Sequence, residues 1–521
     1  MSLVRATATI GSLTLVSRIL GFLRDVLMAR FVGAGMAADA FLIAFRLPNL
    51  FRALFAEGAF SAAFVPMFSR TLAANPDDRN AGQRFAEEVL SVLLPILVVF
   101  TAVMLVATGP VVWALTGGFP DASPEKFALA VEFTRITFPY LLLISLVSLM
   151  GGILNSLGRF CVNAAAPILL NIALIAGMLF FRGDSDVQTA RVQAACVTIA
   201  GVLQFIWLLW ACVRVDIKLR LRWPVLTPMV RKLLVIIGPA ALGAGAVQFN
   251  LLISTALAAR FLPEGAVSYL YYADRLNQLP LGLIGIGVGT ALLPALSRQL
   301  GAGNPQVALH TQNRAIELVL LLTLPAAAAL VVSAVPIISG LLEGGKFTAA
   351  DSSATAAALA AFALGLPAYV LIKVLTPGFY ARSDTKTPVR IAVASMLVNL
   401  VGNLLLIWPL AHVGIALSTA LAAWVNAGAL YVVLQRRGHF ALDARLRRTV
   451  WRLLVAALVM VGVLLALNPL IMGWMHGNII VRGLGLGLLL SAGGIAYLAS
   501  AFALKAFSVG DLRAQLTRRK S

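Results

Sequence analysis

The sequence predicts an all-α polytopic membrane protein with fourteen transmembrane helices. Composition is the first reason: 60% of the 521 residues are hydrophobic, 12% are charged, and mean hydropathy is +0.93. A soluble protein has about a quarter of its residues charged, and a disordered chain carries far fewer apolar residues. Both classes are excluded. The net charge of +20, which in a soluble domain would suggest nucleic acid binding, must therefore be explained relative to a bilayer.

The spans follow from length and apolarity, since a bilayer-crossing helix needs about 20 mostly apolar residues. The runs 89–115 and 233–259 contain no charge at all. The first two spans carry several charges and rest on the repeat and on charge placement. The fourteen expected spans are 8–31, 38–58, 89–115, 133–157, 161–181, 192–213, 233–259, 266–296, 315–341, 353–381, 391–410, 412–434, 453–473 and 483–504.

Charge placement is the second reason and predicts the orientation. Of the 41 Lys and Arg residues, 27 lie at the termini or in the even-numbered loops, and only seven lie in the odd-numbered loops. Positive loops stay on the cytoplasmic side. We therefore expect both termini in the cytoplasm, and most of the basic charge reflects topology.

An internal repeat is the third reason. Pro66 with Ser69-Arg70 recurs as Pro294 with Ser297-Arg298, and Pro139-Tyr140 recurs as Pro367 with Tyr369. Both pairs are offset by 228 residues. Six spans separate the copies, so both copies have the same topology and a pseudo-twofold axis runs along the membrane normal, as in some secondary transporters.

The repeat predicts the domain organisation. Residues 1–222 would form an N-terminal lobe from spans 1–6, and residues 223–437 a C-terminal lobe from spans 7–12. Residues 438–521 would add spans 13 and 14 and a basic cytoplasmic tail. Two six-helix lobes around a central cavity are expected.

The remaining cations fall inside the spans, where an arginine costs about 2.5–3.5 kcal/mol on insertion scales. They are Arg18, Arg24, Arg46, Arg52, Arg135, Arg275 and Lys373. We expect Arg46 and Arg135 to snorkel toward helix ends, and the others to face a protein interior or a wet cavity. The acidic candidates are fewer: Asp25, Asp39, Glu57 and Asp274.

This excess of cations indicates an anionic ligand. Guanidinium groups bind phosphate in a bidentate manner and keep their charge when desolvated, so several arginines from different helices suit a diphosphate. Ser17 and Asn49 either tune the site or bond between helices. The scattered His and Cys residues predict no metal site, and no cluster suited to catalysis is visible.

Several motifs carry a resemblance to a known family. They are the segments at 17–25 (SRILGFLRD), 33–41 (GAGMAADAF), 46–52 (RLPNLFR), 55–66 (FAEGAFSAAFVP), 271–276 (YYADRL) and 386–388 (KTP). Over essentially its whole length the chain resembles the MurJ (MviN) lipid II flippases of bacterial peptidoglycan synthesis. This family belongs to the multidrug/oligosaccharidyl-lipid/polysaccharide exporter superfamily.

The resemblance implies a substrate and a location. The substrate would be lipid II, an undecaprenyl diphosphate that carries a disaccharide-pentapeptide, moved by alternating access from the cytoplasmic to the periplasmic leaflet without covalent chemistry. The protein would lie in the bacterial inner membrane, take part in cell wall biogenesis and cell shape, and meet other cell-wall synthesis proteins. The final two helices would form a groove for the lipid tail. No cofactor or nucleic acid is implied.

The resemblance also implies site residues. The essential cavity arginines correspond to Arg18, Arg24, Arg52 and Arg275. Asp39 occupies the position of a gating or pairing acid, and Lys373 that of a basic cavity residue; Glu57 and Asp274 would support the site with Ser17 and Asn49. One departure is Gln278, where some relatives have a glutamate three residues after the arginine, so charge pairing there is in doubt.

Three alternatives remain. An ion-coupled drug or polysaccharide-lipid exporter of the same superfamily is the first, although an exporter of organic cations would favour an acidic cavity. An integral-membrane enzyme acting on polyprenyl diphosphates would need clustered acids, which the spacing does not provide. A channel or scaffold is the third. For a flippase, the candidate energy sources are the membrane potential, worth about 2.3 kcal/mol per charge per 100 mV, and a monovalent ion.

Overall fold

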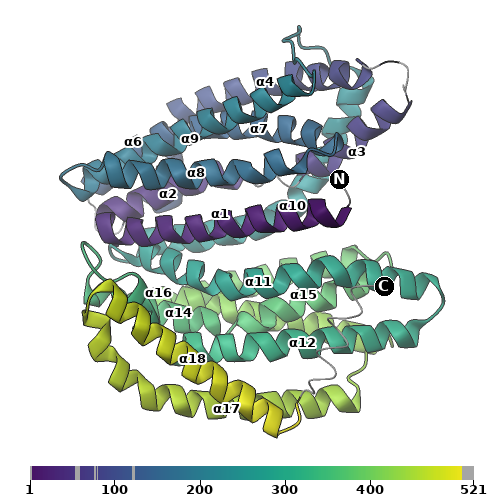
Figure 1. Cartoon of the computed structure of the whole chain (residues 1–521). Coiled ribbons are helices and arrows are strands. Elements are labelled where there is room, and N and C mark those ends of the chain that lie inside the picture. The colour runs from purple at the N-terminus through teal and green to yellow at the C-terminus, as the bar shows by residue number, and fades with distance from the viewer. Residues whose placement is uncertain (1–2, 53–58, 75–77, 79, 120–123, 507–521) are drawn as a thin grey trace. The chain divides into compact units, whose positions relative to one another are not determined.

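The computed structural model describes residues 3–52, 59–74, 78, 80–119 and 124–506, and within them the regular elements are helices (Figure 1). These residues belong to two compact units. The first comprises Met1–Ser268 with the short segment Gly344–Phe347, and the second comprises Tyr269–Glu343 with Thr348–Ser521. The prediction of an all-α fold is confirmed. Helices satisfy backbone hydrogen bonds within one segment, as a lipid environment requires.

Among the residues that the structure describes, the first unit contains helices α1 to α10. Of these, α1 packs along α8, α8 and α7 pack against α9, and α2 packs against α6. Pro139 starts α7 because proline, which has no N–H to donate, is tolerated in a first helical turn. The helices are α1 (Leu3–Val32), α2 (Met36–Phe51), α3 (Ala59–Ala74), α4 (Ala81–Val106), α5 (Thr108–Thr116), α6 (Pro124–Thr137), α7 (Pro139–Ser156), α8 (Phe160–Phe180), α9 (Asp186–Arg214) and α10 (Pro228–Phe261).

The second unit takes in α11 from Tyr269 onward, and its other long helices pack around α12, α15 and the α17–α18 hairpin. A buried apolar core joins these elements, and the Tyr497 hydroxyl within it donates to the Leu321 carbonyl at 2.9 Å. The elements are α11 (Ala266–Gly301), α12 (Pro305–Val332), α13 (Ala334–Leu341), α14 (Ala349–Ala363), α15 (Leu366–Tyr380), α16 (Lys386–Arg436), α17 (Ala444–Met472), the 3-10 turn η2 (Gly473–His476) and α18 (Ile479–Ala503).

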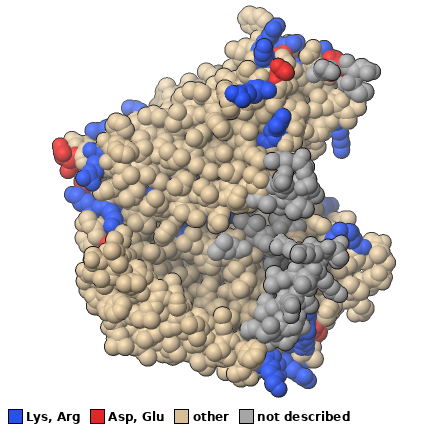
Figure 2. Space-filling model, in the orientation of Figure 1, with Lys and Arg blue, Asp and Glu red and all other residues tan. Residues whose placement is uncertain are grey.

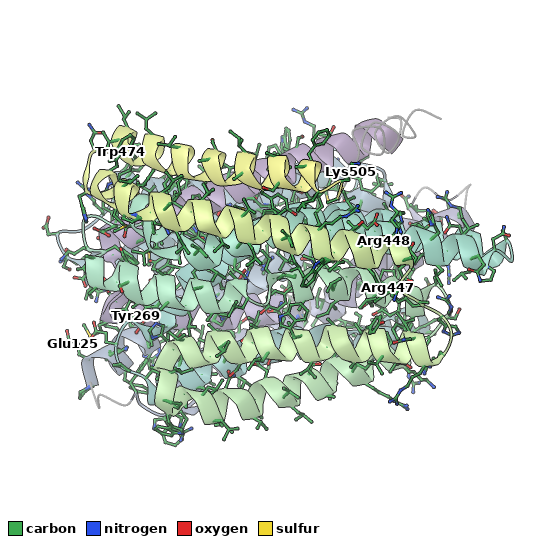
Figure 3. All side chains as sticks on the ribbon, turned by 90° about the horizontal axis from the view of Figure 1, so that it is seen from below. Glu125, Tyr269, Arg447, Arg448, Trp474 and Lys505 are labelled. Atoms are coloured by element: carbon green, nitrogen blue, oxygen red, sulfur yellow. The ribbon has the colours of Figure 1, made fainter. Side chains whose placement is uncertain are left out.

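Most basic residues of the α17–α18 hairpin lie at one end, although Arg482 lies at the other. Arg447, Arg448 and Lys505 lie at one end of these helices, while Trp474 lies at the other (Figure 3). At the basic end, Arg452 connects α17 to the residues that follow α18, because its Nη1 donates to the Lys505 carbonyl at 2.7 Å. The distribution agrees with basic residues gathering on one side of a membrane.

Helix breaks recur along the chain. The break between α4 and α5 at Ala107 corresponds to the break between α12 and α13 at Ser333, 226 residues later. The break between α6 and α7 at Phe138 corresponds to Leu364, between α14 and α15, again 226 residues later. This recurrence supports the internal repeat. The lobe boundaries at residues 222 and 437 stay a prediction; in the structure α10 packs against α2, α3 and α5 of the first unit.

Within the described residues, nine helical segments are long and apolar enough to cross a membrane. One of them, α16, runs through both predicted spans 391–410 and 412–434. The two parts meet at Ala411, whose φ of 48° and ψ of −130° lie outside the helical region, next to Pro409. The sequence prediction of two spans on either side of residue 411 therefore matches this backbone.

The sequence prediction was wrong for residues 59–74, which it left in a loop. This segment is the helix α3, and it packs against α4, α7 and α10. Phe60, Phe64 and Phe68 lie on one face at a four-residue spacing, and the ring of Phe64 stacks on that of Phe85 at 5.6 Å between centroids. The mean hydropathy of this segment does not indicate a helix, because it is lowered by Ser69, Arg70 and Thr71.

In the loop before α16, the carboxylate of Asp384 accepts hydrogen bonds from both ends of that helix. The Thr387 backbone N–H donates to Asp384 at 3.0 Å, and Arg437 Nη1 donates to it at 2.6 Å. These hydrogen bonds from Thr387, together with the ion pair to Arg437, hold the pKa of Asp384 well below its usual range. The carboxylate therefore stays charged at pH values where an ordinary aspartate is protonated. Its ion pair with Arg437, which connects the two ends of α16, is kept at those pH values as well.

A tight turn in the first unit gives a test of the fold. Gly345 has a φ of +62°, Lys346 N donates to the Arg30 carbonyl at 2.9 Å, and a Cβ on Gly345 would collide with that carbonyl oxygen. Gly438 has a φ of +69° but faces open space. Both Gly→Ala changes incur about 1–2 kcal/mol of left-handed strain, but only Gly345→Ala adds the collision.

We therefore expect Gly345→Ala to lower the melting temperature of the purified protein clearly more than Gly438→Ala. Equal shifts for the two variants would show that the turn at Gly345 is not packed against Arg30 as described.

Candidate functional site

Arg24 is a buried cation on α1, and Asp25 and Asn171 hold it in place. Its Nε and Nη2 donate to Asp25 Oδ1 at 3.0 and 2.7 Å, and its Nη1 donates to Asn171 Oδ1 on α8 at 3.2 Å. The side chains of Arg24 and Asp25 are 11% and 6% exposed. The pairing satisfies both charges away from water, as buried ions require. Asp25 therefore offsets part of the positive charge that the sequence alone indicated.

Asn171 was not predicted as a site residue, yet it bonds to two residues of α1. Its Nδ2 donates to the Ser17 carbonyl at 2.9 Å and lies 3.5 Å from the Ser17 hydroxyl, while its Oδ1 accepts from Arg24. A Cβ on Gly21, between these residues, would lie 3.6 Å from the Asn171 amide. Ser17 thus bonds between helices, which was one of its two predicted roles. Nothing local in the sequence reveals Asn171, since it lies 147 residues from Arg24.

Arg18 lies six residues before Arg24 on the same helix and is exposed. Six residues correspond to a rise of about 9 Å. Within the part of the chain that the structure describes, Arg18 has no hydrogen-bond or ion-pair partner. The two arginines therefore differ: Arg24 is fixed by Asp25 and Asn171, whereas Arg18 can reach a ligand without first breaking a contact.

Arg52 and Arg46 lie near the end of α2. Arg52 Nε donates to Asn49 Oδ1 at 3.1 Å, and Asn49 in turn donates to the Phe45 carbonyl at 3.0 Å. Asn49 thus orients Arg52 within its own chain segment. Arg46 was expected to snorkel, but its Nη2 donates to the Thr255 hydroxyl on α10 at 2.9 Å. Arg135, near the end of α6, is exposed, and its expected snorkelling stays a prediction.

Asp39 is the centre of a second buried cluster in the first unit. Its carboxylate accepts from Gly265 N at 2.8 Å, from Ser268 N at 3.0 Å and from the Ser268 hydroxyl at 2.6 Å. Lys126 Nζ donates to it at 3.0 Å, and the two side chains are 1% and 3% exposed. The backbone donors lie at the start of α11, so Asp39 caps that helix. Asp39 therefore joins α2, α6 and the first turn of α11.

Lys126 falls between the predicted spans 89–115 and 133–157, where a loop was expected, and that expectation was wrong. It lies in the first turn of α6, which begins nine residues before the predicted start of the fourth span at 133. Its ammonium group also lies 4.7 Å from the centroid of the Phe119 ring. Burial of the lysine is possible because the carboxylate and the aromatic face replace water around the charge.

The second unit holds the remaining predicted residues. Gln278 Nε2 donates to Asp274 Oδ2 at 2.5 Å, so the residue that departs from the family pattern is a hydrogen-bond partner of this acid. The guanidinium carbon of Arg275 lies 5.0 Å from the centroid of the Tyr271 ring. Lys373 is exposed on α15. Glu57 lies outside the described residues.

The surface agrees with a membrane setting. On the face drawn in Figure 2, charged side chains gather at the ends of the helices, and the helix sides between these ends are almost free of them. Large apolar side chains such as Val99, Leu405 and Leu458 are 61%, 67% and 68% exposed. Long apolar helices that hold buried ion pairs inside and expose apolar sides outside define a multi-pass membrane protein of the transporter type.

Comparison with known proteins names the family. A family model described as lipid II flippase MurJ matches residues 28–485. A probable lipid II flippase MurJ from Rhizobium tropici is 44% identical, over 100% of this chain and 98% of the relative. The lipid II flippase MurJ from Burkholderia cenocepacia is 37% identical, over 89% of this chain and 90% of the relative. The chain belongs to the MurJ lipid II flippase family.

Solved structures agree with this fold. One described as lipid II flippase MurJ in an inward closed conformation superposes with a TM-score of 0.77 at 24% identity, over 95% of this chain and 98% of that chain. An inward-facing multidrug resistance MATE transporter of the MOP superfamily gives a TM-score of 0.66 at 18% identity, over 81% of this chain and 94% of that chain. At these identities the likeness concerns the fold alone.

The Asp39–Lys126 pair gives a test of the second cluster. Lys126→Met removes the cation and leaves a buried carboxylate, which costs about 3–5 kcal/mol. We expect a large drop in melting temperature for this variant. Asp39→Asn in the Lys126→Met background removes the stranded charge and should recover part of the loss. A Lys126→Met protein as stable as the wild type would contradict the buried pair.

Proposed function

We propose that this chain is a lipid II flippase that moves the undecaprenyl-diphosphate-linked precursor from the cytoplasmic to the periplasmic leaflet of the inner membrane. Family membership supports the substrate class. The observation that carries the proposal is on α1, where Asp25 and Asn171 hold Arg24 in a fixed orientation and Arg18 is exposed. A fixed guanidinium and an accessible one on the same helix suit a ligand with two phosphates.

In the proposed mechanism, Arg18, Arg24, Arg52 and Arg275 neutralise the diphosphate. Asn49 and Asn171 keep two of these arginines oriented, so less conformational entropy is lost when the ligand binds. The sugar and peptide occupy a wet cavity that opens alternately to each side. The chain makes and breaks no covalent bond. The membrane potential acts on the charged site as a driving force, with a monovalent ion as the alternative.

Asp39 is proposed to stabilise one state of this cycle. Its carboxylate joins α2 and α6 to the first turn of α11. It does so through an ion pair with Lys126 and hydrogen bonds from Gly265 and Ser268. Such a fully satisfied buried cluster is expensive to open partially. It therefore favours two discrete states over a continuous range of openings.

The polyprenyl tail is proposed to stay in the bilayer beside α17 and α18. The outward faces of these helices carry Leu458, Leu465 and Leu484, which are 68%, 57% and 63% exposed. An exporter of organic cations is less well supported. Asp25 and Asp39, the acids that such a ligand would need, are each already bonded to a cation.

Neutralising the arginines tests the diphosphate hypothesis. Arg24→Ala and Arg275→Ala should abolish the transfer of labelled lipid II to the outer leaflet in a flippase-depleted bacterium that expresses the variant. Arg135→Ala, which removes an exposed arginine outside the proposed set, should support growth. Normal flipping by a well-expressed Arg24→Ala or Arg275→Ala protein would end the hypothesis.

Asn171 is predicted to act through Arg24. Asn171→Leu keeps the side-chain size but removes the hydrogen bonds to Arg24 and Ser17, and the flipping rate should fall severalfold. In an Arg24→Lys background, where the geometry of the guanidinium is already lost, the same change should have little further effect. Asn163→Leu on the same helix serves as the control. Additive losses would mean that Asn171 acts on stability and does not position Arg24.

A further inference from the structure

The connection between α9 and α10 is an extended segment that is fixed to another helix. Residues 216–227, the strap, contain no helix or strand. Ile217 is buried, whereas every residue from Leu221 to Leu226 is exposed. The strap therefore packs against the protein at its beginning and presents its second half outward.

The fixed contact is centred on a buried carboxylate of α4. Glu87 accepts from Arg222 Nε at 2.7 Å and from Arg220 N at 3.2 Å, and the Glu87 side chain is only 1% exposed. Gln83 Nε2 donates both to Glu87 at 2.9 Å and to the Lys218 carbonyl at 2.7 Å. A chain segment held by several bonds to one buried charge has a defined position.

A second contact holds the far end of the strap. The Thr227 hydroxyl donates to Glu88 Oε2 at 2.9 Å, and the same oxygen of Thr227 caps α10 by accepting from Val230 N. The strap is therefore fixed at both ends to consecutive acidic residues of α4.

These contacts set the height of the strap relative to a bilayer. Glu87 and Glu88 are the last charged residues before the run 89–115, which contains no charge. The strap therefore lies where α4 passes from polar surroundings into hydrocarbon, which is the headgroup level. Tryptophan is enriched at this level because its ring is apolar and its N–H is polar.

The exposed half of the strap has the chemistry of this level. Trp223 is 90% exposed, and Leu221, Leu226 and Val225 are 70%, 64% and 57% exposed. Covering the apolar area of these side chains with lipid is favourable, because it removes that area from water.

The charges beside the exposed apolar side chains are mostly positive. Lys218 and Arg220 on the strap are exposed, and so are Arg231 and Lys232 in the first two turns of α10. Asp216 is the one acidic residue of the strap.

We propose that the strap is a binding surface for anionic phospholipid of the surrounding leaflet. Leu221, Trp223 and Leu226 insert among the headgroups and upper acyl chains, and Lys218 and Arg220 select lipids with a net negative charge. Each basic residue near an anionic surface contributes a preference of about fivefold. The strap thereby anchors the link between α9 and α10 to the membrane surface.

The proposal is tested with a dye on the full-length protein in lipid nanodiscs. Trp223→Cys carries an environment-sensitive fluorophore, and identically treated wild-type protein corrects for labelling of Cys161, Cys196 and Cys212. The bilayer contains phosphatidylglycerol and phosphatidylcholine in fixed proportion, with bromine atoms placed on the acyl chains of only one of the two. No polyprenyl diphosphate is present, so the transport substrate plays no part.

The control position is Asn80, which is exposed and precedes Glu87 by seven residues, about 10 Å along α4. We expect the dye at position 223 to be quenched and shifted to shorter wavelength, whereas the dye at position 80 of an Asn80→Cys protein should not be. Brominated phosphatidylglycerol should quench position 223 severalfold more than brominated phosphatidylcholine.

Lys218→Gln with Arg220→Gln then tests the charge selection. The strap contacts use the backbone of these two residues, not their side chains, so the strap should stay fixed to α4. We expect quenching at position 223 to persist but the preference for phosphatidylglycerol to fall toward one. Absence of quenching at position 223 would overturn the membrane contact. Equal quenching by both brominated lipids in the otherwise unaltered strap would overturn the selection for anionic lipid.

Discussion

The cost of placing charge in hydrocarbon is the constraint on which the rest of the structure depends. In the first unit this cost is offset by a counter-ion together with further hydrogen bonds. Arg24 is paired with Asp25 and bonded to Asn171. Asp39 is paired with Lys126 and bonded to Ser268. Satisfied in this way, the charges become rigid points that join α1 to α8 and α2 to α6. The same rigidity is what a binding site needs, because an oriented guanidinium loses little freedom when it binds phosphate.

Much of the fold could be predicted because its main signals are local. Apolar runs of bilayer length indicate most helices, and a constant offset between prolines indicates the repeat, which the breaks at Ala107 and Ser333 reproduce in the backbone. The helix α3 could not be predicted from hydropathy. Ser69 and Arg70 are exposed while Phe64 and Phe68 are buried, so an average over the segment hides an amphipathic helix.

The site was predicted in part, for a similar reason. A charged residue inside an apolar run is visible in the sequence, so Arg24 and Asp39 were expected to matter. Their partners were not visible, because Asn171 and Lys126 lie 147 and 87 residues away. Asn171 is a single amide in the middle of an apolar span, and Lys126 lies between two predicted spans. Pairing across such distances depends on helix packing, which one sequence does not reveal.

The arginines are proposed to recognise a diphosphate, and a direct binding measurement tests this recognition without transport. The purified protein is titrated with polyprenyl diphosphate lacking the sugar and peptide, and with the uncharged polyprenol of the same length. We expect the diphosphate to bind far more tightly, and Arg18→Ala with Arg52→Ala to remove most of that difference while the weak polyprenol binding is unchanged. Equal affinity for the two lipids, or a preference that survives loss of these arginines, would contradict the account.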